Sequence, residues 1–164
     1  MRKEITALLV HDQTEHMWAL ASMLRHQEIC VHHVHSCQAA RCELACANPP
    51  QLVFTDTDLH DGKWQDVVLM AEGAIEPVNV IVVARFMDEK LYIEALEGGA
   101  FDFIVPPFAS FDLAHVVQCA ADNVLDRRGA APQERIAGRQ PLLGPMSSMR
   151  EAKTPGTAAK GSVA

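Results

Sequence analysis

The sequence predicts an α/β protein with a doubly wound, five-stranded parallel sheet. Five short apolar runs alternate with segments in which apolar residues recur at helical spacing. The apolar runs are mostly continuous rather than alternating, which is typical of strands covered on both faces. Because parallel neighbours need a helical crossover between them, this order favours one parallel sheet with helices on both sides.

In the first half of the chain, three apolar runs frame two helical segments. The first run, Ile-Thr-Ala-Leu-Leu-Val, ends at a polar pair. After it Met17, Leu20 and Leu24 recur at helical spacing, and a second helical segment is rich in alanine and leucine. That helix ends before Pro49 and Pro50, since proline lacks a backbone N–H. The predicted strands cover 5–10, 29–34 and 51–55, with helices over 15–27 and 38–47 between them.

In the second half, the run Val-Asn-Val-Ile-Val-Val-Ala predicts the clearest strand. The helix after it ends at Gly98 and Gly99, a common stop signal. Pro106 and Pro107 interrupt the last apolar run and end the fifth strand. The predicted strands cover 78–84 and 103–105, and the predicted helices cover 64–70, 89–98 and 111–125.

Charge and composition divide the chain into two parts. The formal net charge is −7, yet residues 129–164 carry five basic and two acidic side chains, so residues 1–128 carry −10. The C-terminal part also has no Phe, Trp or Tyr with which to build a core. We expect a folded acidic domain over 1–128 and a flexible, disordered tail over 129–164. The acidity of the domain argues against direct nucleic-acid binding, which needs a basic face.

Cysteine usage and hydropathy indicate the compartment. The chain has no apolar stretch of about 20 residues, the length that spans a bilayer. Its N-terminus reaches His11 and Asp12 too soon for a signal peptide. The five cysteines are odd in number and form no Cys-x-x-Cys pair, which fits reduced thiols. We expect a cytoplasmic protein without a membrane partner.

The residues at the predicted strand ends form a candidate site, because ligands of doubly wound sheets bind beyond the carboxyl ends of the strands. His11 and Asp12 follow the first strand, and Asp56 follows the third. Ala84 ends the fourth strand and Pro106 follows the fifth. Two carboxylates at one edge of a sheet favour a divalent cation, most simply an oxygen-ligated Mg²⁺.

Four segments of the sequence resemble the receiver domain of bacterial two-component response regulators. They are Leu-Leu-Val-His-Asp-Gln at 8–13, Pro-Gln-Leu-Val-Phe-Thr-Asp-Thr-Asp-Leu-His-Asp-Gly at 50–62, Val-Ile-Val-Val-Ala-Arg at 80–85, and Ala-Leu-Glu-Gly-Gly-Ala-Phe-Asp-Phe-Ile-Val-Pro-Pro-Phe at 95–108. They stand in the family's order and spacing. The resemblance implies a flavodoxin-like (βα)5 fold and a role in phosphorelay signal transduction rather than an enzymatic activity. It also implies a histidine kinase or phosphotransfer protein as donor and a protein partner downstream.

The resemblance also implies roles for individual residues. Asp56 matches the aspartate that accepts the phosphoryl group, which would make the chain a phosphoprotein. In this family Mg²⁺ would be held by Asp12, Asp56 and the backbone carbonyl of Asp58. Phe103 matches the aromatic residue that turns inward when the domain switches conformation.

Three positions depart from the family's pattern. His11 stands where the family has the first of two consecutive acids, so we expect weaker Mg²⁺ binding and a neutral imidazole at the rim of the pocket. Ala84 replaces a Ser or Thr whose hydroxyl binds the phosphate, and Pro106 replaces a lysine that pairs with it. Each lost contact costs on the order of 1–3 kcal/mol, so phosphorylation should be slow or weakly transmitted.

Three functions remain open. The first is an atypical, single-domain response regulator that accepts a phosphoryl group on Asp56 and signals through protein–protein interaction. Its contact face would be that of the fourth helix, fifth strand and fifth helix, where Tyr92 and the segment 101–108 supply aromatic residues. The alternative is a phosphorylation-independent pseudo-receiver that acts as an interaction module or a homodimer. The third is a metal sensor that uses His11, Asp12 and Asp56.

Two further patterns have a functional and a structural interpretation. Arg85 could replace the missing lysine charge, but strand alternation should point it away from the face of residue 84. A group of histidines and cysteines suggests zinc, yet its spacing does not match structural zinc sites, and we favour a polar strand end followed by partly buried thiols. The group consists of His32, His33, His35, Cys37, Cys42 and Cys46.

The tail carries a second resemblance. The segment Pro-Leu-Leu-Gly-Pro-Met-Ser-Ser-Met-Arg-Glu at 141–151 resembles the opening of the ATPase module of nitrogen-regulator-type transcription activators, with Met149 five residues after Gly144. No Walker A sequence follows, so no nucleotide site is expected there. Either the chain is a receiver separated from such a module, or the tail is a chance low-complexity sequence.

Overall fold

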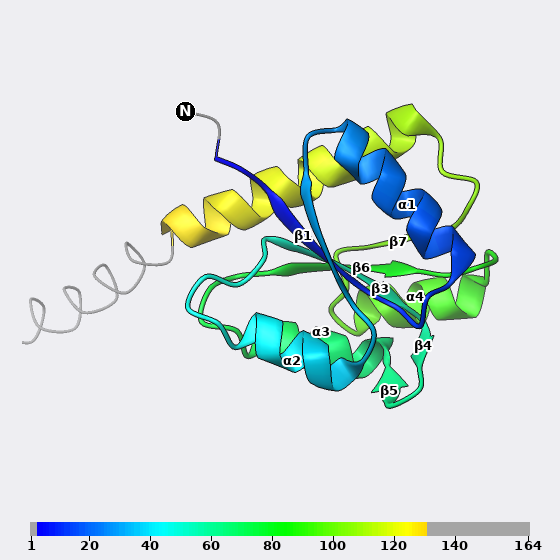
Figure 1. Ribbon diagram of the computed structural model, residues 1–164, viewed down its shortest axis with the longest axis horizontal. Helices are drawn as coiled ribbons and strands as arrows, with labels where there is room; N and C mark the ends of the chain where they lie inside the picture. Colours follow the sequence, from blue (N-terminus) through cyan, green and yellow to red (C-terminus); the bar gives the residue numbers. More distant parts are fainter. Residues whose placement is uncertain (1–2, 131–164) are drawn as a thin grey trace, which may run out of the picture. The chain divides into compact units, whose positions relative to one another are not determined.

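The computed structural model describes residues 3–130, which form a five-stranded parallel sheet between two layers of helices (Figure 1). The strand order is β2-β1-β3-β6-β7, so the chain winds outward in both directions from β1 and β3. The strands are β1 (Thr6–Val10), β2 (Cys30–Val34), β3 (Leu52–Asp56), β6 (Asn79–Val83) and β7 (Asp102–Ile104). This confirms the predicted fold class. Residues 131–164, which include most of the predicted tail and its ATPase-like segment, lie outside the described range.

The helices divide between the two faces of the sheet. The helices are α1 (Glu15–His26), α2 (Cys37–Leu44), α3 (Trp64–Glu72), α4 (Glu89–Glu97) and a C-terminal helix over 110–130. α1 and the C-terminal helix cover one face, and α2, α3 and α4 cover the other (Figure 1). No helix within 3–130 is long and apolar enough to span a bilayer.

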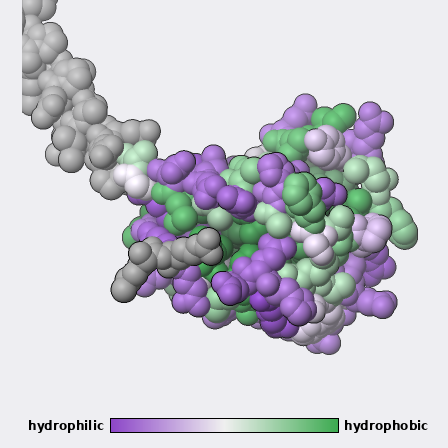
Figure 2. Space-filling view, turned by 90° about the horizontal axis from the view of Figure 1, so that it is seen from above, coloured by the Kyte–Doolittle hydropathy of each residue, from purple (hydrophilic) through white to green (hydrophobic). Residues whose placement is uncertain are grey.

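Strand alternation separates two cores. In β1, Ala7 and Leu9 pack with the apolar residues of α1 and the C-terminal helix, while Leu8 and Val10 pack with those of α2 and α3. Phe54 of β3 is fully buried in the first of these cores. Since both faces of the central strands are covered, their sequences are mostly apolar. Outside the cores, hydrophilic and hydrophobic residues are interspersed on the face that carries α1 (Figure 2).

A two-stranded hairpin after β3 is absent from the sequence prediction. It consists of β4 (Asp58–Leu59) and β5 (Gly62–Lys63), which pair antiparallel. Strands of two residues are too short to show a hydrophobic period. Gly62 is needed there because a Cβ atom would lie 2.7 Å from the Cys37 sulfur and 2.8 Å from an oxygen of Asp66.

The hairpin caps α2. The two carboxylate oxygens of Asp61 accept hydrogen bonds from the backbone N–H groups of Cys37 (2.7 Å) and Gln38 (3.0 Å). The Ser36 hydroxyl oxygen accepts from the third N–H group of the helix, that of Ala39. These bonds to Asp61 lower the pKa of its carboxyl group. At its other end α2 stops at Leu44, three residues before the predicted boundary.

A buried amide fastens the C-terminal helix to the sheet. Asn79, the first residue of β6, donates to the carbonyl of Ala120 (2.8 Å) and to the side chain of Asn123 (3.0 Å). Its own side-chain oxygen accepts from Arg127 at 2.9 Å. The helix continues to 130 within the described residues, beyond the predicted end at 125.

Candidate functional site

The carboxyl edge of the sheet contains an open pocket of about 530 Å³. It gathers residues that follow β1, β3 and β6, as the sequence predicts for a doubly wound fold. Its lining consists of Asp12, Thr14, Asp56, Thr57, Asp58, Ala84, Arg85, Phe86, Asp88 and Leu91. The structure thus brings together Asp12, Asp56 and Asp58, the three predicted metal-site residues.

Asp56 is the last residue of the central strand β3 and is 4% exposed. The Thr14 hydroxyl donates to its Oδ2 atom at 2.9 Å. The Thr57 backbone N–H donates to its Oδ1 atom at 2.9 Å. The Nε2 atom of His16 lies 3.5 Å from the same Oδ1 atom, and the His16 side chain is 10% exposed. Asp56 is therefore a buried carboxylate whose two oxygens have different surroundings.

Asp12 is held by the β4–β5 hairpin. Its Oδ2 atom accepts from the backbone N–H of His60 at 2.7 Å, and its Oδ1 atom lies 2.9 Å from the Nδ1 atom of that ring. The hydrogen bond and the charge of Asp12 raise the pKa of the exposed His60 side chain. The hairpin thus links the acidic pocket with α2, because Asp61, the next residue, caps that helix.

His11 is not at the rim of the pocket, which corrects the sequence prediction. Its side chain is fully buried and its Nε2 atom lies 3.0 Å from the Nδ1 atom of His33 on β2. The His11 ring also meets Trp18 edge-on, with ring centroids 5.3 Å apart. Burial, followed by the neighbouring His33 and His35, lowers the pKa of His11 to about 4. It is therefore neutral at pH 7, as expected, but it belongs to a ring cluster between β1, β2 and α1.

Ala84 and Pro106 stand where the family has a hydroxyl and a lysine, and only Ala84 lines the pocket. Ala84 is buried and lines the pocket, so the site lacks a hydroxyl at this point. Arg85 also lines the pocket. Because β6 ends at Val83, strand alternation does not extend to Arg85 and gives no reason to exclude it. Pro106 is not among the pocket-lining residues and forms a cis peptide bond with Pro107.

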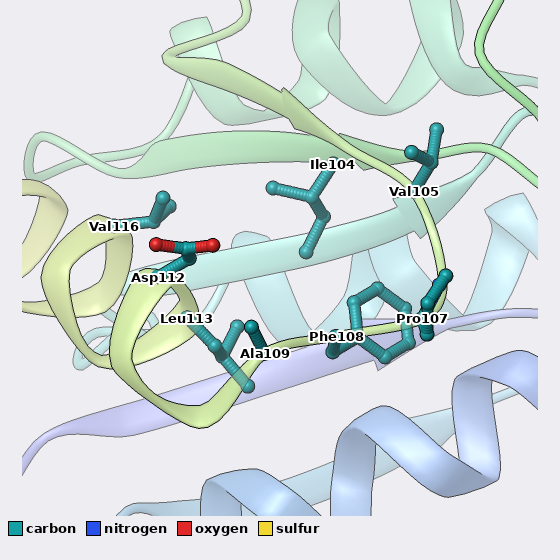
Figure 3. A pocket seen from close by; sticks show the side chains of 8 residues that line it. All are labelled: Ile104, Val105, Pro107, Phe108, Ala109, Asp112, Leu113 and Val116. Atoms are coloured by element: carbon teal, nitrogen blue, oxygen red, sulfur yellow. The ribbon is translucent and has the colours of Figure 1, made fainter.

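The segment after β7 borders a second, apolar pocket instead. Figure 3 shows this pocket, of about 140 Å³, between the end of β7 and the start of the C-terminal helix. Pro107, Phe108 and Leu113 line it together with the carboxylate of Asp112. Its apolar walls supply no positive charge that could replace the lysine of the family.

Phe103 is buried, with 5% exposure, and meets the ring of Tyr92 edge-on at 5.8 Å between centroids. The segment 101–108 is consequently not the exposed aromatic surface that the sequence suggests. The large apolar side chains exposed nearby come from the β6–α4 loop, α4 and the start of the C-terminal helix. They are Phe86, Met87, Tyr92, Ile93, Leu96 and Phe111.

Within 3–130, no group of three or more His, Cys, Asp or Glu side chains is arranged to hold a metal ion. The zinc interpretation therefore has no support, and Cys42 and Cys46 are exposed rather than partly buried. Burial raises the pKa of the Cys37 thiol to about 11. The metal-sensor interpretation also lacks a ligand, because His11 points away from the pocket into its ring cluster.

The strand order and the acidic pocket at the carboxyl edge define a doubly wound domain of the flavodoxin-like class. Residues 7–118 match the response regulator receiver domain, and the chain belongs to that family. Receiver domains act in two-component signalling, interact with histidine kinases or phosphotransfer proteins, and generally bind Mg²⁺ at the acidic pocket. They are in general non-enzymatic signalling domains.

A curated relative is the response regulator protein PilR of Pseudomonas aeruginosa, which is 28% identical over 144 residues. The alignment covers 88% of this chain and 31% of PilR, so the chain spans about a third of the relative's length. Solved structures share the fold. The signal receiver domain of an HD domain-containing protein from Pseudomonas fluorescens has a TM-score of 0.65 at 18% identity, covering 76% of this chain and 99% of its own. A CheY-like receiver domain protein from Methanospirillum hungatei has a TM-score of 0.64 at 16% identity, covering 76% and 98%.

Proposed function

We propose that this receiver accepts a phosphoryl group on Asp56 from a histidine kinase or a phosphotransfer protein. The observation that carries the proposal is the position of Asp56 at the end of the central strand, bordering an open pocket. Its carboxylate is the nucleophile that phosphoryl transfer requires. The absence of the hydroxyl at Ala84 and of the ammonium at Pro106 supports a slow reaction, because fewer charge-assisted contacts stabilise the phosphoryl oxygens.

The pocket offers the kind of donor that Mg²⁺ binds, because Asp12, Asp56 and Asp58 all line it. Mg²⁺ in proteins prefers oxygen ligands and uses one or two carboxylates together with waters and substrate phosphates. We propose Asp12, Asp56 and the backbone carbonyl of Asp58 as its ligands. When bound, the ion supplies positive charge for the phosphoryl oxygens. Both carboxylates already accept hydrogen bonds from the protein, and His11 adds no third carboxylate, so the affinity should be low.

The test is incubation with acetyl phosphate and Mg²⁺, followed by mass spectrometry of the intact protein and of its peptides. We expect slow addition of one phosphoryl group on the peptide that contains Asp56, and none in the variant Asp56→Asn. Asp58→Asn is a matched control, because it removes an exposed carboxylate from the same pocket without removing the nucleophile or its backbone carbonyl. No labelling of the folded wild-type protein, or equal labelling of Asp56→Asn, contradicts the proposal.

The second candidate is a pseudo-receiver that acts without phosphorylation, as an interaction module or a homodimer. It is favoured by the same missing contacts and by the apolar side chains exposed on α4, Tyr92, Ile93 and Leu96. Asp56→Asn separates the two functions, since it abolishes signalling only in the first. In the first function, beryllofluoride with Mg²⁺ also changes the oligomeric state or the partner affinity. In the second it does not.

We place the downstream contact on α4 and the loop before it, where Phe86 and Met87 are exposed. We also propose that the domain over 1–128 acts in the cytoplasm, which is supported by its five free cysteines. Replacing Ile93 and Leu96 by glutamine should weaken partner binding and leave labelling of Asp56 unchanged, because neither residue lines the pocket.

A further inference from the structure

The Thr14 hydroxyl does not cap the helix that it precedes, but binds Asp56. It is the N-cap residue of α1, with extended backbone angles, a position where threonine commonly accepts a hydrogen bond from the first turn of its own helix. Here the side chain makes no such capping bond. Its Oγ1–H group instead donates to Oδ2 of Asp56 at 2.9 Å, across 42 residues of sequence.

The two oxygens of Asp56 differ in what holds them. Oδ1 accepts from the Thr57 backbone N–H at 2.9 Å and has the Nε2 atom of His16 at 3.5 Å. That Nε2 atom is buried and has no hydrogen-bond partner. Thr14 lines the open pocket together with Asp56, whereas His16 is not among its lining residues. Thr57, which donates to Oδ1, lines the pocket as well, and Oδ2 differs in being bound by a side-chain hydroxyl.

We propose that the Thr14 hydroxyl is a ligand of the phosphoryl group in this site and takes the place of the hydroxyl missing at Ala84. The inference rests on the proposed phosphorylation of Asp56 and assigns Oδ2 as the attacking atom. Oδ2 forms a bond to the phosphorus of the donor, the bond from phosphorus to the leaving group breaks, and that group leaves with the bonding electrons. With acetyl phosphate the leaving group is acetate, and no proton has to move.

The same geometry gives separate tasks to the neighbouring donors. The Thr57 backbone N–H holds Oδ1 at 2.9 Å, which leaves Oδ2 to the Thr14 hydroxyl. The Thr14 hydroxyl holds Oδ2 before the transfer and can rotate about its Cα–Cβ bond to donate to a phosphoryl oxygen afterwards. A hydrogen bond to a charged oxygen is stronger than a neutral one, so its loss should be measurable in both the rate of labelling and the lifetime of the product.

The experiment compares labelling by acetyl phosphate and Mg²⁺ in four proteins: the wild type, Thr14→Val, Thr14→Ser and the double variant Thr14→Val with Ala84→Thr. We expect Thr14→Val, which keeps the shape and loses the hydroxyl, to label about 10-fold more slowly and to lose its phosphoryl group sooner. Thr14→Ser should resemble the wild type. The double variant should recover much of the rate, because it restores a hydroxyl on the opposite side of the pocket.

The outcomes separate this inference from the proposed function. If the wild type labels on Asp56 and Thr14→Val labels equally fast, the role of Thr14 is wrong and the proposed function stands. If the folded wild type does not label, the proposed function fails and this inference with it. Urea unfolding of each variant gives the structural control, and Thr14→Ala provides the same comparison if Thr14→Val does not fold. A rate that neither Thr14→Ser nor Ala84→Thr restores also overturns the role of the hydroxyl.

Discussion

The burial of His11 should make the free energy of unfolding depend on pH. Its pKa is about 4 in the folded protein, against an ordinary value of 6.5. The unfolded chain therefore binds a proton that the folded chain excludes, and the stabilisation is fully present above pH 6.5 and is lost as the pH falls toward 4. The full difference corresponds to about 3 kcal/mol, and between pH 7 and pH 5 the loss should be about 2 kcal/mol.

Three other groups with shifted pKa values also make the stability depend on pH. The pKa of His33 is also lowered, by burial and by the charge of Arg25, so its contribution has the same sign. The pKa of His60 is raised, so its contribution is present below pH 6.5 and is lost as the pH rises through its folded value. The pKa of Asp61 is lowered, and its stabilisation is lost only near the acid range of carboxylates. Measurements between pH 7 and pH 5 therefore report mainly on buried histidines.

The assay is urea unfolding of the wild type and of His11→Asn at several pH values. His11→Asn removes the titrating group, so its free energy of unfolding should fall about 2 kcal/mol less between pH 7 and pH 5 than that of the wild type. His26→Asn, at an exposed histidine of α1, is the matched control for the substitution of a histidine by asparagine. Parallel pH profiles for the wild type and His11→Asn would refute the reasoning.

Three further predictions concern the scaffold of the site. Asn79→Ala removes three side-chain hydrogen bonds and should lower the free energy of unfolding in urea by about 2–3 kcal/mol. Asn123→Ala removes only one of these bonds and should lower it by about 1 kcal/mol. Asp61→Ala should destabilise α2, seen as faster hydrogen exchange of its first-turn amides, whereas equal exchange would show that the cap is not needed. Gly62→Ala should cost about 1–3 kcal/mol in thermal unfolding, because the new methyl group would lie 2.7 Å from the Cys37 sulfur. An unchanged melting temperature would show that the hairpin can move aside.

Most helices and strands could be predicted because the apolar pattern of each one is local and several residues long. The run from 78 to 84 is apolar except at Asn79, and β6 occupies Asn79–Val83 within it. The positions of Asp12 and Asp56 follow from the rule that strand ends share one edge of the sheet. The β4–β5 hairpin was missed because each strand has two residues, and the end of α2 was missed because a chain reversal can begin before the prolines that mark it.

The parts of the site that could not be predicted depend on long-range contacts. His11 looked like a rim residue because its polarity was considered without its neighbours, and only the pairing of β1 with β2 shows that His33 lies beside it. Thr14 was missed since a threonine before a helix is ordinarily an N-cap. Its place in the loop that follows β1 was the available signal, because that loop lies at the carboxyl edge of the sheet.

The central position of β3 has a consequence for amide exchange. β3 has a hydrogen-bonded strand on each side, and all five of its residues are buried, whereas β2 and β7 each have one neighbour. Its amide protons can exchange with solvent only when the whole domain opens, so their exchange free energy should equal the global free energy of unfolding. The carboxylate of Asp56 is thus attached to one of the strands whose amide protons should exchange most slowly.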